Sequence, residues 1–228
     1  MSESYSILDL DKFESFINKQ DKVSVEDYDR EYFEGQWREN QNSYDFEKRR
    51  EIEGKNPSLI KETFEPTKAL DMGCGPGALM LFLNELGVNC HGIDGSKTSK
   101  EIAMEKIRDL ITVSDICNTD IQDGEYDLII CREVLEHLTF KQIKKSVEEM
   151  ARITSKYVYI TTRFHPDPKS IYDISTEPEV DPTHITCLNI EMLRFLCVIS
   201  GLRRRNDLES RMDWLNKGRV LVYEKAGK

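Results

Sequence analysis

Three glycines within five residues, in Asp71-Met72-Gly73-Cys74-Gly75-Pro76-Gly77, separate a short apolar run from a segment with helical periodicity. The apolar run, 69–71, ends at an aspartate, and Leu79, Phe82 and Leu83 then recur at helical spacing. Glycine lets the backbone turn tightly and approach a ligand closely. A strand, a glycine loop and a helix in this order predict a βαβ unit that binds its ligand at the carboxyl end of the strand.

The alternation of strands and helices continues to the end of the chain. Thr139 is expected to cap the helix that follows the clearest strand, and Gln142 completes a capping box. Five alternations and a terminal strand predict an α/β fold: a doubly wound, mostly parallel Rossmann-like sheet with an antiparallel terminal strand. The strands expected after the first are 88–94, 110–113, 126–131, 157–161 and 219–223.

Residues 1–64 are polar, acidic and poorly periodic, and we expect them to form an N-terminal helical cap beside a ligand-binding domain at 65–228. Aromatic residues are concentrated between Tyr28 and Trp37. They predict either helices that pack onto the domain or a mobile cap over a cleft. Residues 163–187 contain four prolines and are predicted to be a long loop, a feature that is often functional in compact domains.

The net charge of the chain indicates which kinds of partner it can bind. A formal net charge of -10 disfavours nucleic acid, and we interpret the basic run Arg203–Arg205 as a solvated stretch that leads into a strand. No apolar run approaches the roughly 20 residues that span a bilayer, so no membrane association is expected. The first residues lack the basic and apolar regions of a secretory signal, which predicts a cytoplasmic protein. These features leave the oligomeric state open.

The glycine loop alone is compatible with two cofactors. Gly73, Gly75 and Ala78 satisfy the relaxed dinucleotide fingerprint, and Asp94 ends the second strand, where an acid binds ribose hydroxyls. A nicotinamide-dependent enzyme is therefore one hypothesis.

The residues around the loop favour another cofactor. Leu70-Asp71-Met72-Gly73-Cys74-Gly75-Pro76-Gly77 closely resembles the first motif of class I S-adenosylmethionine-dependent methyltransferases, and the resemblance continues in order over residues 65–225. It implies that Asp71 faces the methionine part of the cofactor, above the glycines. The cofactor-binding residues that it implies are Asp71, Gly73, Cys74, Gly75, Gly77, Asp94, Gly95, Asp115, Ile116 and Arg132. This cofactor carries a sulfonium and an ammonium instead of a pyrophosphate, so acids near the loop are favourable.

An acid-histidine cluster follows the fourth strand. Glu133, Glu136 and His137 stand at i, i+3 and i+4, which places them on one helix face if a helix begins there. Carboxylates and imidazoles suit a divalent ion such as Mg²⁺ or Mn²⁺, and His184 could complete the set, with His165 as a weaker candidate. The pattern resembles the metal sites of small-RNA terminal 2′-O-methyltransferases and of ubiquinone-pathway O-methyltransferases.

Several functions remain compatible with these motifs. We expect methyl transfer to an oxygen, or a nitrogen, of a small-molecule acceptor. His137, His184 and Glu133 are the catalytic candidates, as metal ligands or as a metal-free base and its orienting groups. Methylation of an RNA end with a divalent ion is an alternative that the acidic balance disfavours. A non-catalytic interaction module is another, and the intact first motif together with the cluster argues against it.

Overall fold

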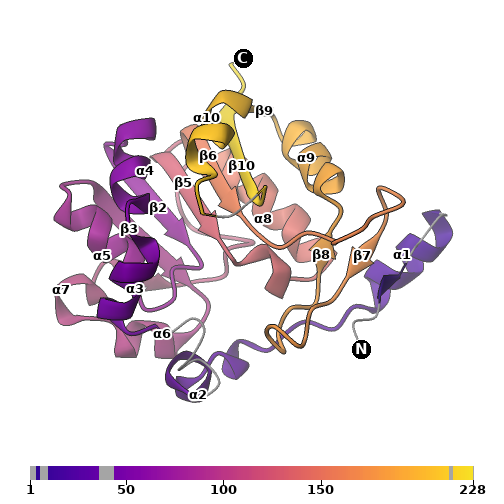
Figure 1. Cartoon of the computed structure of the whole chain (residues 1–228), viewed down its shortest axis with the longest axis horizontal. Helices are drawn as coiled ribbons and strands as arrows, with labels where there is room; N and C mark the ends of the chain where they lie inside the picture. The colour runs from indigo at the N-terminus through magenta and orange to yellow at the C-terminus, as the bar shows by residue number, and fades with distance from the viewer. Residues whose placement is uncertain (1–3, 6–9, 36–43, 216–217, 228) are drawn as a thin grey trace.

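The computed structural model describes residues 4–5, 10–35, 44–215 and 218–227, and a seven-stranded sheet runs through its centre (Figure 1). The strand order is β4-β3-β2-β5-β6-β10-β9. β10 runs antiparallel to both of its neighbours, and the other neighbouring pairs are parallel. The strands are β2 (Lys68–Met72), β3 (Asn89–Asp94), β4 (Ile111–Val113), β5 (Tyr126–Arg132), β6 (Thr154–Thr161), β9 (Leu202–Arg204) and β10 (Val220–Lys225). This architecture confirms the predicted mostly parallel sheet with an antiparallel strand near its end.

Helices cover both faces of the sheet because the strand side chains alternate between two apolar cores. In β5, Ile129 and Cys131 belong to one core, whereas Leu128 and Ile130 belong to the other. The first core is completed by α8 (Phe140–Ile153) and α9 (Ile190–Ile199), and the second by α4 (Asn56–Phe64), α5 (Ala78–Glu85) and α10 (Asn206–Met212). Two short helices, α6 (Lys97–Ile102) and α7 (Glu105–Arg108), lie between β3 and β4. The capping box expected at Thr139 is present at the start of α8.

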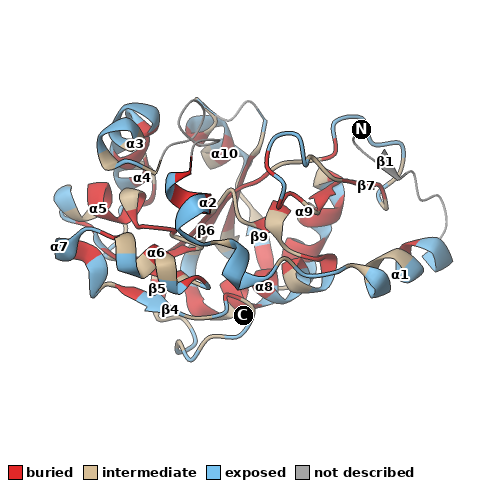
Figure 2. Ribbon diagram, turned by 90° about the horizontal axis from the view of Figure 1, so that it is seen from below, coloured by how far each residue is buried: buried red, intermediate tan, exposed pale blue. Residues whose placement is uncertain are grey.

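The N-terminal region divides into two parts. α3 (Phe46–Glu53) and α4 lie beside the sheet, and Ile60 and Phe64 of α4 are buried in the second core. Upstream, α1 (Leu10–Lys19), a 3₁₀ turn (Val25–Asp27) and α2 (Arg30–Glu34) run along one edge of the molecule (Figure 1). Figure 2 shows that α1 and the stretch after it are largely exposed, whereas α5 is mostly buried and α9 carries buried residues on one side. The domain boundary at residue 65 stays a prediction.

Two expectations about irregular regions are met in part, and residues 163–187 are irregular over most of their length. The predicted loop 163–187 contains β7 (Ile174–Ser175) and the start of β8 (Cys187–Leu188), and β1 (Ser4–Tyr5) pairs with β7 to form a three-stranded sheet. The basic run does not lead into a strand as expected: Arg203 and Arg204 belong to β9 and Arg205 precedes α10, although the Arg203 side chain is 72% exposed. The charges of this run are neutralised locally: Arg204 pairs with Glu209 at 2.6 Å, and the other two arginines pair with Glu224 of β10. None of the helices in the described part of the chain has the length and apolar character needed to cross a bilayer.

Candidate functional site

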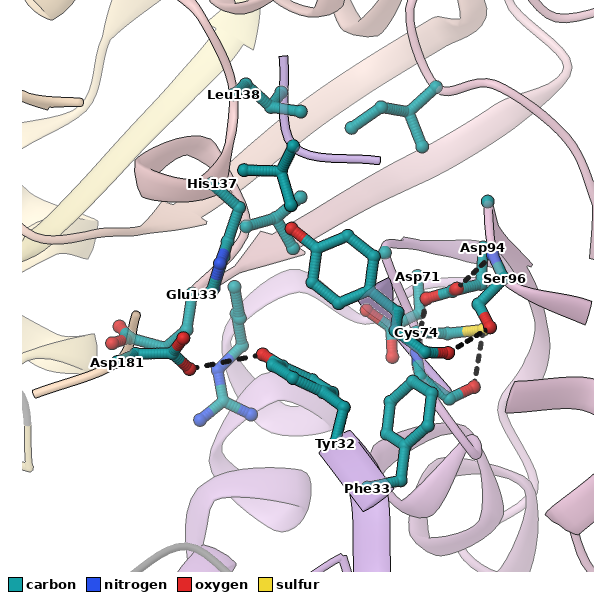
Figure 3. A pocket seen from close by; sticks show the side chains of 18 of the residues that line it. Tyr32, Phe33, Asp71, Cys74, Asp94, Ser96, Glu133, His137, Leu138 and Asp181 are labelled. Carbon is teal, nitrogen blue, oxygen red and sulfur yellow. Dashed lines mark hydrogen bonds between the residues drawn. The ribbon is translucent and has the colours of Figure 1, made fainter. Parts of the chain in front are cut away.

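A cavity of about 1020 Å³ opens at the carboxyl ends of the central strands. Asp71, Asp94 and Arg132, which lie at the ends of β2, β3 and β5, contribute to its wall. Figure 3 shows two groups of polar side chains in it: Asp71, Cys74, Asp94 and Ser96 on one side, and Glu133, His137 and Asp181 on the other. The aromatic ring of Tyr32 lies between them, and that of Phe33 lies beside the first group. The cavity therefore occupies the position where open α/β sheets bind ligands, beside the point at which the strand order reverses.

The glycine loop is held against β3 by its own backbone. The N–H groups of Gly73 and Cys74 donate to the carbonyl of Ile93, at 2.8 and 3.1 Å. Gly73 has a φ of +77°, and a Cβ at this position would lie 2.4 Å from Cγ2 of Val134. Gly73, Cys74 and Gly75 line the cavity. Gly77 does not, because a Cβ there would point toward Ile107 at 2.8 Å.

Replacement of Gly73 with alanine is expected to destabilise the fold by about 2–4 kcal/mol, because the new methyl group combines left-handed strain with the Val134 clash. Gly87→Ala is the matched control: its φ is +82°, but nothing lies within 4 Å of a Cβ there. The control should cost about 1–2 kcal/mol. Thermal unfolding of both variants measures the difference, and equal losses would contradict the role assigned to the Val134 contact.

Asp94 links the loop to the next helix. One carboxylate oxygen accepts the N–H of Gly75 at 2.8 Å, and the other accepts the N–H of Ser96 at 2.9 Å. Burial raises the pKa of Asp94, and these two N–H groups oppose the rise. Each carboxylate oxygen has two lone pairs, so each can accept a further hydrogen bond. The Ser96 hydroxyl donates to the carbonyl of Tyr28 at 2.6 Å, which ties the N-terminal segment to this side of the cavity.

A buried charge network lies beside Asp71. Arg132 pairs with Glu53 of α3 at 2.8 Å, and Glu53 also pairs with Arg49 at 2.8 Å and accepts from the amide of Asn56 at 3.0 Å. Glu53 is 1% exposed. Burial raises the pKa of Asp71 to about 7, although the Arg132 guanidinium opposes the rise. Sequence analysis missed Glu53, because the charged run around it has the composition of a solvated helix.

Three further residues of the predicted cofactor-binding set follow β3 and β4 in the chain. Gly95, Asp115 and Ile116 all line the cavity. Asp115 is exposed and accepts the N–H of Cys117 at 2.8 Å, and Ile116 is buried.

Glu136, His137 and His184 come together on the opposite wall. One ligand atom from each lies within 4.8 Å of the others, and Glu136 and His184 are buried. Glu136 accepts from the Thr162 hydroxyl at 2.8 Å, and its backbone carbonyl accepts the N–H groups of 185 and 186, which positions His184. Within the described part of the chain, Oε1 of Glu136 and Nδ1 of His184 have no hydrogen-bond partner. Burial raises the pKa of Glu136 and lowers that of His184.

The helix face proposed for Glu133, Glu136 and His137 is not formed. Glu133 has a left-handed φ of +54° and precedes a single 3₁₀ turn at Leu135–His137, so the α-helical spacing does not apply. Oε2 of Glu133 instead accepts from Arg219 at 2.9 Å. His165, the weaker candidate, lies outside the group, and its Nδ1 accepts the N–H of Asp167 at 3.2 Å.

Aromatic residues of the N-terminal segment contact the acid-histidine wall. The ring of Tyr28 meets that of His137 edge-on at 5.9 Å, and the ring of Tyr32 meets that of Tyr28 at 4.9 Å. The Tyr32 hydroxyl donates to Oδ2 of Asp181 at 3.2 Å (Figure 3). The mobile cap stays a prediction, and Trp37, its last expected residue, lies outside the described residues.

Parts of the chain are similar to known proteins. Residues 70–160 match the family model described as a methyltransferase domain. The chain is similar to a ubiquinone biosynthesis O-methyltransferase of Methylococcus capsulatus, with 39% identity over 31% of this chain and 32% of that protein. It is also similar to norajmaline N-methyltransferase of Rauvolfia serpentina, with 32% identity over 40% of this chain and 33% of that protein. The matches thus span about a third of the length of each curated relative.

A solved structure shares the fold. It is an S-adenosylmethionine-dependent methyltransferase from Archaeoglobus fulgidus, with a TM-score of 0.56 and 16% identity, over 80% of this chain and 100% of that one.

Proposed function

Because the chain belongs to the class I S-adenosylmethionine-dependent methyltransferases, we propose that it transfers a methyl group to an oxygen, or a nitrogen, of a small-molecule acceptor. The acceptor would lie in the half of the cavity that His137 and His184 border. S-adenosylmethionine supplies a methyl group on a sulfonium, a good leaving group, so the protein's main task is to position the two reactants.

The observation that carries this proposal is the arrangement of acids around the glycine loop. Asp94 keeps acceptor capacity on both carboxylate oxygens, which suits the two hydroxyls of a ribose. Asp71 is buried beside the loop, where a cofactor ammonium would favour its ionised form. A pyrophosphate would instead face like charge from both acids. These residues fit S-adenosylmethionine better than a dinucleotide.

The acid-histidine group fits a divalent ion, and we include such an ion in the proposal. Glu136, His137 and His184 offer one carboxylate and two imidazoles, and two of their buried ligand atoms have no other partner among the described residues. A bound ion would act as a Lewis acid that lowers the pKa of an acceptor hydroxyl. Glu133 lies outside this compact group: its Oε2 accepts from Arg219, and its buried Oε1, which has no hydrogen-bond partner among the described residues, is the atom that could join the set.

The small-molecule class is supported by the names of the curated relatives, which refer to ubiquinone biosynthesis and to norajmaline. The RNA-end alternative gains no support from the densest basic run of the sequence. Each arginine of Arg203–Arg205 is already paired with an acid of this chain.

Titration calorimetry of the full chain with S-adenosylmethionine, S-adenosylhomocysteine and NAD tests the proposed cofactor. We expect saturable 1:1 binding of the first two and none of NAD. Binding should also release protons near neutral pH, because the pKa of Asp71 is raised to about 7 and a neighbouring ammonium lowers it. Buffers with different ionisation enthalpies measure this release. Binding of NAD without binding of S-adenosylmethionine would refute the proposal.

A further inference from the structure

We propose that Thr183 and Asp181 hold His137 in the tautomer that carries its proton on Nδ1, so that Nε2 is unprotonated at the cavity wall. Thr183 is thereby a positioning residue for His137. The inference rests on the proposed function only in that the site uses His137.

The three side chains form a short hydrogen-bonded chain. Nδ1 of His137 lies 2.7 Å from Oγ1 of Thr183, and this oxygen lies 2.6 Å from Oδ1 of Asp181. Oδ1 also accepts the backbone N–H of Thr183 at 2.9 Å, while Oδ2 accepts the hydroxyl of Tyr32 at 3.2 Å. Asp181 is 3% exposed and Thr183 is 9% exposed. The two partners of the histidine are therefore buried, whereas His137 itself is half-buried at the cavity wall.

Counting protons fixes the direction of each bond. A carboxyl group that receives three donors is favoured in its ionised form, in which it can only accept. The Thr183 hydroxyl has a single proton, and that proton must lie between Oγ1 and Asp181. A lone pair of Oγ1 then faces His137, so Nδ1 must be the donor. A neutral imidazole carries one N–H, which leaves Nε2 without a proton.

The opposite arrangement is unfavourable. If the Thr183 hydroxyl donated to His137, its oxygen would face a carboxylate oxygen at 2.6 Å with no proton between them. Two electron-rich atoms at this distance in a buried site repel each other strongly.

The consequence concerns both roles considered for His137. A ligand nitrogen and a proton-accepting nitrogen must each be unprotonated. The segment that supplies His184 thus also sets the tautomer of His137, because Thr183 immediately precedes His184 in the sequence. A free imidazole distributes its proton over both nitrogens. Loss of the Thr183 hydroxyl should therefore give a mixture of the two His137 tautomers.

Nuclear magnetic resonance tests the tautomer directly. The full chain is labelled with ¹⁵N-histidine and treated with a chelator, and the ring nitrogens are recorded at a pH where imidazole is neutral. A His137→Gln variant assigns the signals. We expect one protonated Nδ1 in the parent, a mixture of tautomers in Thr183→Val and Thr183→Ala, and restoration in Thr183→Ser. Tyr32→Phe is the matched control, since it removes a different bond to the same carboxylate and should leave the tautomer unchanged.

Kinetics supply a second readout. Both Thr183→Val and Thr183→Ala should lower kcat about 10–100-fold, the usual cost of losing a group that orients a site histidine, with little change in KM for S-adenosylmethionine. A parent His137 protonated on Nε2, or a valine variant that keeps a single Nδ1 tautomer, would overturn the inference. Failure of the parent to bind S-adenosylmethionine would refute the proposed function, yet the tautomer measurement would still decide the inference.

Discussion

Replacement of Asp94 with alanine should weaken binding of S-adenosylhomocysteine by about 100-fold or more. The carboxylate keeps one acceptor position on each oxygen beyond those that Gly75 and Ser96 occupy. Two charge-assisted bonds to ribose hydroxyls contribute about 1.5–3 kcal/mol each. Their joint loss, about 3–6 kcal/mol, corresponds to at least two orders of magnitude in Kd.

The controls separate lost ligand contacts from a damaged loop. Asp94→Asn keeps the shape of the side chain but sets an amide N–H₂ group against one of the two backbone N–H donors, so it should also bind weakly. Asp109→Ala removes the same charge from an exposed position that does not line the cavity, and should bind as the parent does. Circular dichroism and thermal unfolding establish that each variant is folded. A folded Asp94→Ala protein whose Kd lies within threefold of the parent would show that this acid does not hold the ribose.

The fold was largely predictable because each strand and helix of the sheet is marked by a local pattern in the sequence. Each central strand is a short apolar run bounded by a turn, and Asp71 and Asp94 mark strand ends that parallel pairing brings to one edge. Arg132, the third charged residue at this edge, was implied only by the family resemblance and not by a local signal of its own. Its partner Glu53 lies 79 residues away in a charged helix, and only tertiary packing shows which charge of that helix is buried.

The acid-histidine wall was predictable in composition but not in geometry. The spacing of Glu133, Glu136 and His137 suggested a helix face, but the left-handed conformation of Glu133 separates it from the 3₁₀ turn that follows. Tyr32 contacts Asp181, 149 residues away in the sequence, and Thr183 contacts His137, 46 residues away. Sequence periodicity carries no information about contacts at such separations. Irregular segments are fixed by such contacts and not by propensity.

Complete removal of divalent ions should abolish methyl transfer, and Mn²⁺ or Mg²⁺ should restore it. Glu136, His137 and His184 form a compact donor set, and the buried oxygen of Glu136 has no partner among the described residues to replace an ion. Burial favours the protonated form of Glu136, so ion binding must displace a proton, and ion affinity should rise with pH. Activity of chelated and reconstituted protein, measured together with bound manganese, tests this prediction.

Single variants distinguish which side chains hold the ion. His137→Ala and Glu136→Gln should lose manganese and turnover together, by more than the roughly 10–100-fold that an outer-shell change costs. Glu133→Gln should have a smaller effect, because Glu133 pairs with Arg219 and lies outside the compact group. His165→Ala is the matched control, a buried histidine outside the group whose loss should leave ion binding intact.

The alternative mechanism makes the opposite forecast. If His137 or His184 accepts the proton of the acceptor without an ion, exhaustive chelation should leave activity unchanged, and crystals grown with manganese should show no anomalous peak between these side chains. His137→Ala would then lower turnover without any change in metal content. Burial lowers the pKa of His184, so this imidazole stays neutral at physiological pH but is a weak base. The unprotonated nitrogen of His184 suits a base and a metal ligand alike, so its lowered pKa does not separate the two mechanisms. The compact donor set, and the buried Glu136 oxygen that has no partner among the described residues, are what favour the metal ion.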